Sequence, residues 1–183
     1  MNCKAAPTRA NDEGAAFAVG DAVVHPHHGA GLVVSRRRRR LLGSAARNYL
    51  EIEIELAHSS LQIIVPCDAA RTVGLRAVVG RRRLRRIVEV LEGDPEGAPA
   101  SWSARQKHYR AKLKGGDVLD LAAVVRDLAL RHAESGLPSS ERELYKRSRR
   151  VLASELRYAL GVDADRAAAY IDEHVAARPP AAG

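Results

Sequence analysis

The hydrophobic periodicity of the chain changes once along its length, and this change limits the folds that the chain can adopt. Between residues 49 and 56, the apolar residues Leu50, Ile52, Ile54 and Leu56 alternate with three glutamates. Such alternation is typical of a β-strand with one buried face and one solvated face. Later apolar residues recur at helical spacing, first at Val118, Leu121, Val125 and Leu128. We therefore predict an α+β fold of two domains, with a small antiparallel β domain followed by an all-α domain.

Turn signals and caps divide the chain further. Apolar, β-branched runs predict strands within residues 17–25, 29–35, 48–56 and 61–66. Start and stop signals predict helices over residues 117–136, 140–161 and 165–177, with a shorter helix after Trp102. The caps are Asp117 and Asp163 at two starts, a Ser140/Glu143 capping box at the third, and Gly136 and Gly161 at two ends.

Composition predicts where one domain ends and the next begins. Residues 67–93 indicate a short turn or helix and then a strand or helix that ends near Gly93. The segment that follows is rich in Pro and Gly and has little to bury, which is typical of a linker. The predicted parts are a disordered leader at 1–16, a β domain at 17–93, a linker at 94–101, a helical domain at 102–178 and a tail at 179–183.

Charge and cysteine usage restrict the partners and the compartment. The chain has 30 Lys and Arg against 22 Asp and Glu, a net charge of +8, which favours a polyanionic or acidic partner. Its two cysteines lack CxxC spacing, so neither a disulfide framework nor a zinc knuckle is indicated. No apolar run approaches the length of about 20 residues needed to span a membrane, and no signal-peptide core is present. We expect a cytoplasmic protein without membrane contact.

The sequence shows no motif of a known catalytic site. His25, His27 and His28 in HPHHG suggest a metal site at first, but Pro26 and Gly29 favour a tight turn between two strands. The chain contains no nucleophile elbow, phosphate loop or metal-binding helix motif. We therefore expect a non-enzymatic protein with no catalytic residues, no metal and no cofactor.

Two basic stretches are candidate binding sites. Arginines 36 to 40 stand between two predicted strands, either as a solvated rim that blunts a sheet edge or as a site for phosphates or an acidic protein. An exposed edge there would also allow recognition by an added strand. The only tryptophan, Trp102, is either a core anchor or a ring presented to nucleic acid beside basic side chains. The candidates are Arg36, Arg37, Arg38, Arg39 and Arg40 for a protein partner, and Trp102, Arg105, Lys107, Arg110, Lys146, Arg147, Arg149 and Arg150 for DNA.

Several motifs together resemble a known family. FAVGDAVVHPHHGAGLVV, LQIIVP, VGLRAVVG, SWSARQK and GDVLDLAAVVRDLALR occur in the order and near the spacing of the CarD/CdnL family of bacterial RNA-polymerase-binding transcription regulators. The resemblance runs from about Phe17 to Ala177. It implies a Tudor-like β domain, similar to the polymerase-interacting domain of transcription-repair coupling factors, that docks on the RNA polymerase β subunit. It also implies a helical domain that contacts promoter DNA at the upstream edge of the transcription bubble.

The resemblance also implies roles for single residues. Trp102 matches a tryptophan that wedges into the minor groove at the fork and favours the melted promoter, while Arg105 and Lys107 match basic positions that follow it. Arg39 matches an arginine used on polymerase. We expect a monomer that stabilises the open promoter complex without base-specific readout and reaches the nucleoid through polymerase.

The chain departs from the family pattern at three places. The arm between Gly43 and Pro66 is longer, residues 63–65 are apolar where the family has a basic position, and Ala104 stands where a basic residue is common. A free-standing basic nucleic-acid-binding module without polymerase contact is the alternative function. A metal-dependent enzyme using the HPHHG histidines is the third.

Overall fold

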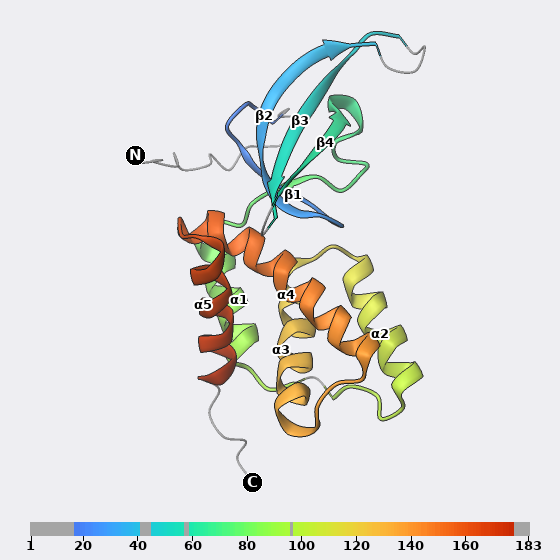
Figure 1. Ribbon diagram of the computed structural model, residues 1–183, viewed down its shortest axis with the longest axis vertical. Helices are drawn as coiled ribbons and strands as arrows, with labels where there is room; N and C mark the ends of the chain where they lie inside the picture. Colours follow the sequence, from blue (N-terminus) through green and yellow to red (C-terminus); the bar gives the residue numbers. More distant parts are fainter. Residues whose placement is uncertain (1–16, 41–44, 57–58, 96, 178–183) are drawn as a thin grey trace. The chain divides into compact units, whose positions relative to one another are not determined.

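The computed structural model describes residues 17–40, 45–56, 59–95 and 97–177. The predicted leader at 1–16 and tail at 179–183 lie outside these residues. The chain divides into a sheet unit that ends at Val78 and a helical unit that begins at Val79 (Figure 1). The predicted α+β class, with β structure before helices, is confirmed.

The sheet unit is one antiparallel sheet. In the described part of the unit, its strands lie in the order β4-β3-β2-β1-β5. The predicted strands are confirmed, and a short fifth strand follows them. The bounds are Ala22–His25 for β1, Gly29–Arg39 for β2, Arg47–Glu55 for β3, Ser60–Pro66 for β4 and Arg76–Ala77 for β5, with a 3-10 turn at Cys67–Ala69.

The alternation in β3 builds the core of this unit. Leu50, Ile52 and Ile54 are buried, and they pack against Val23, Val33, Val65 and Leu75 from the other strands and the segment before β5. The glutamates between them take the opposite, more solvated face, as predicted. The prediction that Leu56 continues the buried face is wrong: it is exposed, because β3 ends one residue before it.

Two features of β1 and β2 bear on function. The tight turn predicted for HPHHG is confirmed, since β1 ends at His25 and β2 begins at Gly29, directly opposite. Strand β2 runs further than predicted and includes Arg36–Arg39, which pair with β3 residues from Leu50 to Arg47. These four arginines therefore belong to a strand and not to a loop between strands, because residues 47–50 supply backbone partners for them.

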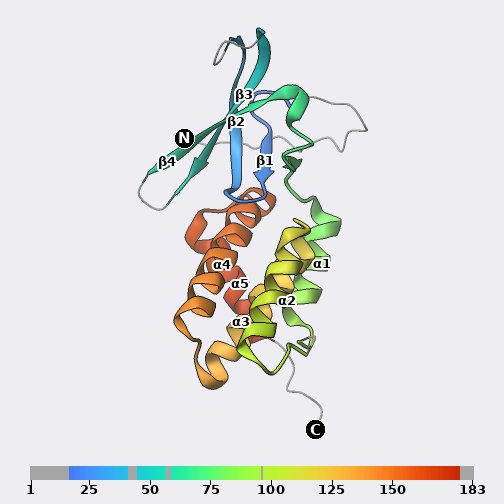
Figure 2. The same ribbon diagram turned by 90° about the vertical axis from the view of Figure 1, so that its right-hand side faces the viewer.

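The helical unit contains five α-helices among its described residues: α1 Arg81–Glu92, α2 Trp102–Lys114, α3 Val118–Ser135, α4 Ser139–Leu160 and α5 Ala164–Ala176. Apolar faces of α1, α3, α4 and α5 meet in one core (Figure 2). Its fully buried side chains include Ile87, Leu91, Val125, Leu152, Leu156 and Ile171. No helix in the described part of the chain is long and apolar enough to cross a membrane.

The boundary between the units differs from the predicted linker. Helix α1 buries Ile87 and Leu91 in the helical core, so it belongs to the second unit although it precedes residue 94. The start of that unit is fixed by the buried carboxylate of Glu155, which accepts a hydrogen bond of 3.2 Å from the backbone N–H of Val79. The segment 94–101, of which residue 96 is not described, connects α1 to α2 inside the helical unit. The low apolar content of this segment was interpreted as a domain boundary, but it reflects only an exposed loop within one unit.

Most predicted caps are confirmed. Asp117 and Asp163 accept backbone hydrogen bonds at the starts of α3 and α5, and Gly136 and Gly161 end α3 and α4 with positive φ. The Ser140/Glu143 capping box is wrong. Helix α4 begins one residue earlier, Pro138 is its cap residue, and no side chain caps it. The hydroxyl of Ser140 instead accepts hydrogen bonds from the side chains of Trp102 and Gln106 on α2.

Gly31 tests the close packing of the sheet. A Cβ at this position would lie 2.3 Å from the carbonyl oxygen of Glu53, a backbone atom that cannot turn away. We expect Gly31→Ala to destabilise the sheet unit by about 1–3 kcal/mol, the usual cost of overpacking. Amide hydrogen exchange of β2 and β3 should accelerate while that of α3 and α4 stays unchanged. Gly97→Ala, where a Cβ meets nothing, is the control, and equal protection in both variants would contradict this packing.

Candidate nucleic-acid and protein interfaces

Trp102 is the first residue of α2 and lies half outside the protein. Its side chain is 51% exposed, and its indole Nε1–H donates a hydrogen bond of 3.2 Å to the hydroxyl of Ser140 on α4. Ser101 caps the helix by accepting from the N–H of Ala104. The indole is therefore not a buried core anchor. It is held on one edge and leaves an apolar surface open to a ligand.

Arg105 does not present its charge to solvent. Its guanidinium is buried and Nε donates to Glu141 Oε1 at 3.1 Å, while Nη1 donates to the carbonyl oxygens of Pro99 and Ala100. Position 105 falls on the inner face of α2, one turn before the buried Tyr109. The prediction of an exposed phosphate contact at Arg105 is corrected accordingly. Its observed contacts hold the loop that leads into Trp102.

A polar network joins three helices beneath this loop. Glu141 is fully buried, and its second oxygen, Oε2, lies 3.4 Å from Nε of Arg131 on α3 without hydrogen-bond alignment. Gln106 reaches the same Ser140 hydroxyl that holds the indole, at 3.4 Å. Removing such charges from water costs free energy, and the attraction within a buried pair offsets that cost only when its geometry is good. The network therefore contributes a defined loop conformation more than net stability.

Tyr109 anchors α2 below the network. It is buried against Val124, Leu128 and Leu137, a small core separate from the main one. Burial raises the pKa of Tyr109 to about 12, and the carboxylates of Asp127 and Glu141 contribute to the increase. The phenol stays neutral near pH 7, so α2 rests on an uncharged packing surface.

The outer face of α2 carries an unbroken basic row. One face of α2 begins at Ser103 and continues, at intervals of four, three and four residues, with the basic side chains Lys107, Arg110 and Lys114. All are exposed, and the three cations make no ion pair within the described residues. The predicted contacts Lys107 and Arg110 thus lie side by side, and Lys114, missing from the candidate set, extends their row. We call Lys107, Arg110 and Lys114 the α2 basic row.

The four cations predicted on α4 do not form one surface. Arg147 lies two turns after Ser140 on the same side of α4, and Arg150 is exposed one turn further. Lys146 pairs with Glu143 on another side of the helix. Arg149 bonds to Asp172 and to the carbonyl oxygen of Ala168 on α5, and the bond to Asp172 raises its pKa. By position on the helix, Arg147 lies on the side of α4 that carries Ser140, whereas Lys146 and Arg149 lie on other sides.

The arginines of β2 are distributed over both faces of the sheet. Cross-strand pairing places Arg37 opposite Tyr49, and Arg39 forms an ion pair with Glu51 on that same face. Arg36 and Arg38 take the other face, while Arg40 follows the strand end. Arg36, Arg37, Arg38 and Arg40 make no ion pair within the part of the chain that the structure describes.

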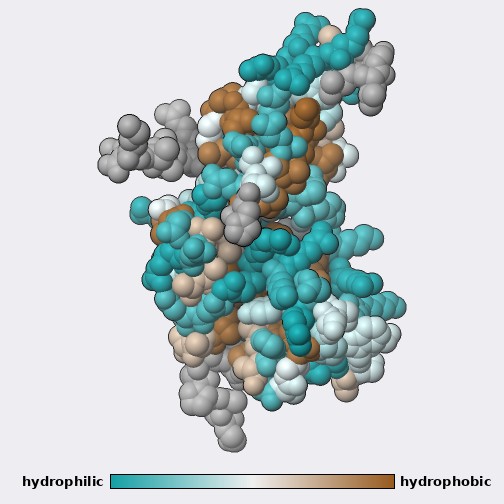
Figure 3. Space-filling model, in the orientation of Figure 1, coloured by the Kyte–Doolittle hydropathy of each residue, from teal (hydrophilic) through white to brown (hydrophobic). Residues whose placement is uncertain are grey.

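The face that carries Arg37 and Arg39 is also partly apolar and partly acidic. Leu32 and Ile64 are exposed there, opposite Glu53 and Glu51 respectively. Figure 3 shows hydrophobic residues gathered over one side of the sheet unit, with hydrophilic residues on the neighbouring arm. We call Leu32, Ile64, Arg37, Arg39, Glu51 and Glu53 the outer sheet face.

The histidines of the HPHHG turn lie close to one another. The ring centroid of His25 is 4.7 Å from that of His28 and 5.9 Å from that of His27. Burial lowers the pKa of His25, as do His28 and His27, so the ring is neutral near pH 7 and Nδ1 accepts from the N–H of His27. Among the described residues, no three His, Cys, Asp or Glu side chains are arranged to hold a metal ion.

Two glutamates two residues apart on α4, one buried and one exposed, give a matched test of the buried network. Glu141→Ala leaves Arg105 and Arg131 without their carboxylate, which should cost about 3–5 kcal/mol in the free energy of unfolding. Glu143→Ala removes an exposed partner of Lys146 and should cost less than about 1 kcal/mol. Urea titrations followed by Trp102 fluorescence measure both. Equal costs would show that the Glu141 pair does not constrain the fold.

Sequence comparisons agree with this architecture. The model of the CarD-like/TRCF RID domain matches residues 17–79, and the model of the CarD C-terminal domain matches residues 86–172. The chain is also similar to a Bacillus subtilis (strain 168) protein named "Putative transcription factor YdeB", with 27% identity over 146 residues, covering 80% of this chain and 94% of that protein. The two family models meet near the boundary of the two structural units and follow each other in the same order. The chain therefore belongs to the CarD-like family of transcription regulators.

Proposed function

We propose that this transcription regulator binds the RNA polymerase β subunit through its sheet unit and promoter DNA, at the upstream edge of the bubble, through its helical unit. By these contacts it stabilises the open promoter complex without base-specific readout. The observation that carries the proposal is the half-exposed Trp102 at the start of α2. Its indole is held by Ser140 of α4, and the outer face of α2 is basic. No catalytic step is needed for this activity.

The helical unit has the two components that binding at a fork requires. The α2 basic row offers charges to phosphates, which position a protein on DNA without reading sequence. The indole of Trp102 offers a rigid apolar surface that can enter a base step and unstack it. A base step that is already open has less stacking to lose, so the same contact favours melted DNA over the closed duplex.

The outer sheet face favours a protein partner over nucleic acid. Glu51 and Glu53 stand on the same face as Arg37 and Arg39 and would repel phosphates. Exposed Leu32 and Ile64 supply apolar area of the kind found in protein interfaces. These features support docking on polymerase and give no support to a free-standing nucleic-acid module that uses the β2 arginines.

The β2 edge provides a second means of docking. Strand β1 pairs with β2 only from Gly29 to Leu32, and the loop before β1 bonds to Val33. Beyond Val33, no described strand covers that edge of β2. An extended segment of the β subunit can add to it by backbone hydrogen bonds, with arginine side chains on either face for acidic partners.

Trp102→Ala tests the proposed wedge. The variant should fold, because half of the side chain is already exposed, and it should shorten the lifetime of open complexes. Aromatic contact with a base contributes about 1–3 kcal/mol, or about 5- to 150-fold in lifetime. The lifetime is measured by challenging promoter complexes with a competitor, and Trp102→Phe is the conservative control. An unchanged lifetime with Trp102→Ala would refute the wedge.

Arg37→Glu tests docking by the outer sheet face. Charge reversal in a desolvated interface costs about 2–5 kcal/mol, so affinity for purified polymerase should fall by at least about 30-fold. Arg71→Glu changes the same charge at an exposed position outside β2 and is the control. Titration of labelled protein with polymerase core enzyme gives both affinities. If the two variants bind equally well, the outer sheet face is not the docking surface.

A further inference from the structure

Helix α1 begins with an unusual concentration of arginine. Its sequence RRRLRRIVEVLE places Arg81, Arg82, Arg83, Arg85 and Arg86 within its first six residues, and its first turn has no acidic side chain. None of these arginines was among the residues that sequence analysis selected for binding.

Helix stability does not account for these residues. Cations near a helix N-terminus oppose the helix dipole, and acidic residues are favoured there. Two of the charges are balanced, since Arg83 Nη2 lies 2.7 Å from both oxygens of Asp117 and Arg86 pairs with Glu89. Arg81, Arg82 and Arg85 have no ionic partner within the described residues. Uncharged or acidic side chains at these positions would stabilise the helix more than arginines do. Binding of an external anion is therefore the simplest reason for the excess of positive charge at the start of α1.

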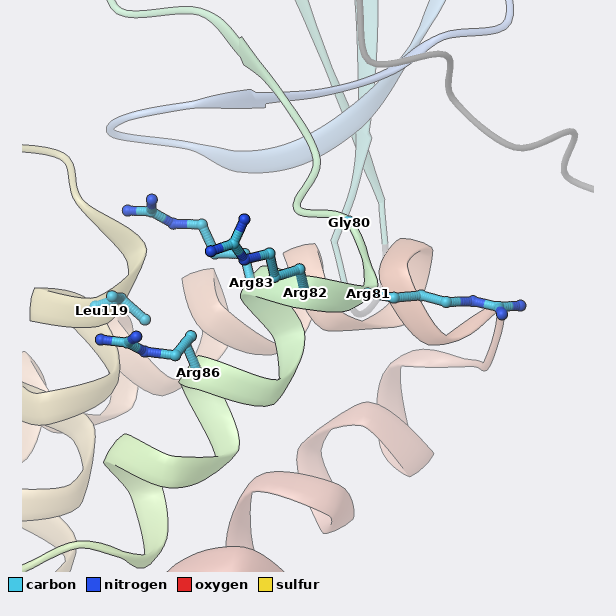
Figure 4. Close-up of a pocket in the computed structure, with 6 residues that line it drawn as sticks. All are labelled: Gly80, Arg81, Arg82, Arg83, Arg86 and Leu119. Atoms are coloured by element: carbon cyan, nitrogen blue, oxygen red, sulfur yellow. The ribbon is translucent and has the colours of Figure 1, made fainter.

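The arginines border a hollow on the surface of the helical unit. Gly80, the arginines at 81, 82, 83 and 86, and Leu119 of α3 line it, with a volume of about 640 Å³. Figure 4 shows Arg82, Arg83 and Arg86 extending to the same side of α1, toward Leu119, whereas Arg81 extends away from them. An open, cationic hollow suits phosphate groups of a macromolecule better than an enclosed small ligand, which would need apolar walls.

The position of the hollow relates it to Trp102. Arg83 pairs with Asp117, which comes three residues after Lys114, the last residue of α2, whereas Trp102 is the first residue of that helix. A helix of 13 residues is about 20 Å long, so the two sites are separated by roughly that distance. Along α2, the residues of the α2 basic row fall between Trp102 and Asp117. At about 3.4 Å per base pair, this distance corresponds to about six base pairs of duplex.

We propose that Arg82, which has no ion pair within the described residues and extends toward Leu119, forms a second phosphate-binding site together with Arg86, whose pair with Glu89 is solvent-exposed. This site holds duplex DNA about six base pairs from the step contacted by Trp102. The site rests on the proposed function and extends it, because it assigns α1 to the same DNA. It anchors the double-stranded side of the fork, so the wedge acts against a held duplex.

The test compares single arginine variants of the full-length protein. Fluorescent fork-junction DNA is titrated with wild type, Arg82→Ser and Arg85→Ser at several salt concentrations. Arg85 is exposed on the same helix but does not line the hollow, so both changes remove one charge from α1. For Arg82→Ser we expect several-fold weaker binding at low salt and a salt slope that is less steep by about 0.9, the value of one phosphate contact. Arg85→Ser should retain the wild-type slope.

Two further measurements separate the outcomes. Shortening the duplex arm to less than about six base pairs should abolish the difference between Arg82→Ser and wild type. Equal slopes for all three proteins would overturn the second site, as would a loss of polymerase affinity in Arg82→Ser without DNA, which would assign the hollow to a protein partner. Trp102→Ala in the same titration reports on the proposed function: if it still loses the preference for forked over blunt DNA, only the second site fails.

Discussion

The contact of Arg105 with the buried carboxylate of Glu141 determines how the helical unit presents Trp102. Through it, one guanidinium binds α4 and the carbonyl oxygens of the loop before Trp102. A bulky aromatic side chain at the start of a helix would otherwise move with a frayed end. Here the loop, the cap at Ser101 and the indole N–H are all held. A ring that is fixed before binding loses less conformational entropy on entering DNA, so more of its contact free energy remains to favour the open state.

The basic side chains that give the chain its net positive charge have different surroundings in the two units. In the sheet unit, arginines share a face with glutamates and exposed apolar residues, a mixture that suits the proposed protein partner better than a phosphate backbone. In the helical unit, Lys107, Arg110 and Lys114 have no acidic neighbours among their described contacts, and their attraction is to any phosphate backbone. Specificity in this account comes from docking on polymerase, while the DNA contacts act on shape and melting.

Local signals were sufficient for much of the fold and for part of the site. The period-two alternation in β3, the HPHHG turn and the caps Asp117 and Asp163 depend on near neighbours in sequence, and each was predicted. The burial of Arg105 depends on Glu141, which lies 36 residues away in sequence, and no local pattern indicates that pairing. Ser140 likewise had the pattern of a helix cap, yet its hydroxyl serves Trp102 and Gln106. The packing of α1 in the helical core was missed for the same reason, because low hydrophobicity in 94–101 shows where the chain is exposed and not which unit it belongs to.

We propose that Trp102 opens one base step at the upstream edge of the bubble while the sheet unit is bound to polymerase. The most direct measurement places 2-aminopurine at single positions across that edge and records its fluorescence when the protein is added to polymerase–promoter complexes, since this base brightens when it is unstacked. We expect an increase confined to one step at the fork, and none when Trp102 is replaced. No change at the fork, or an equal change along the whole bubble, would contradict it.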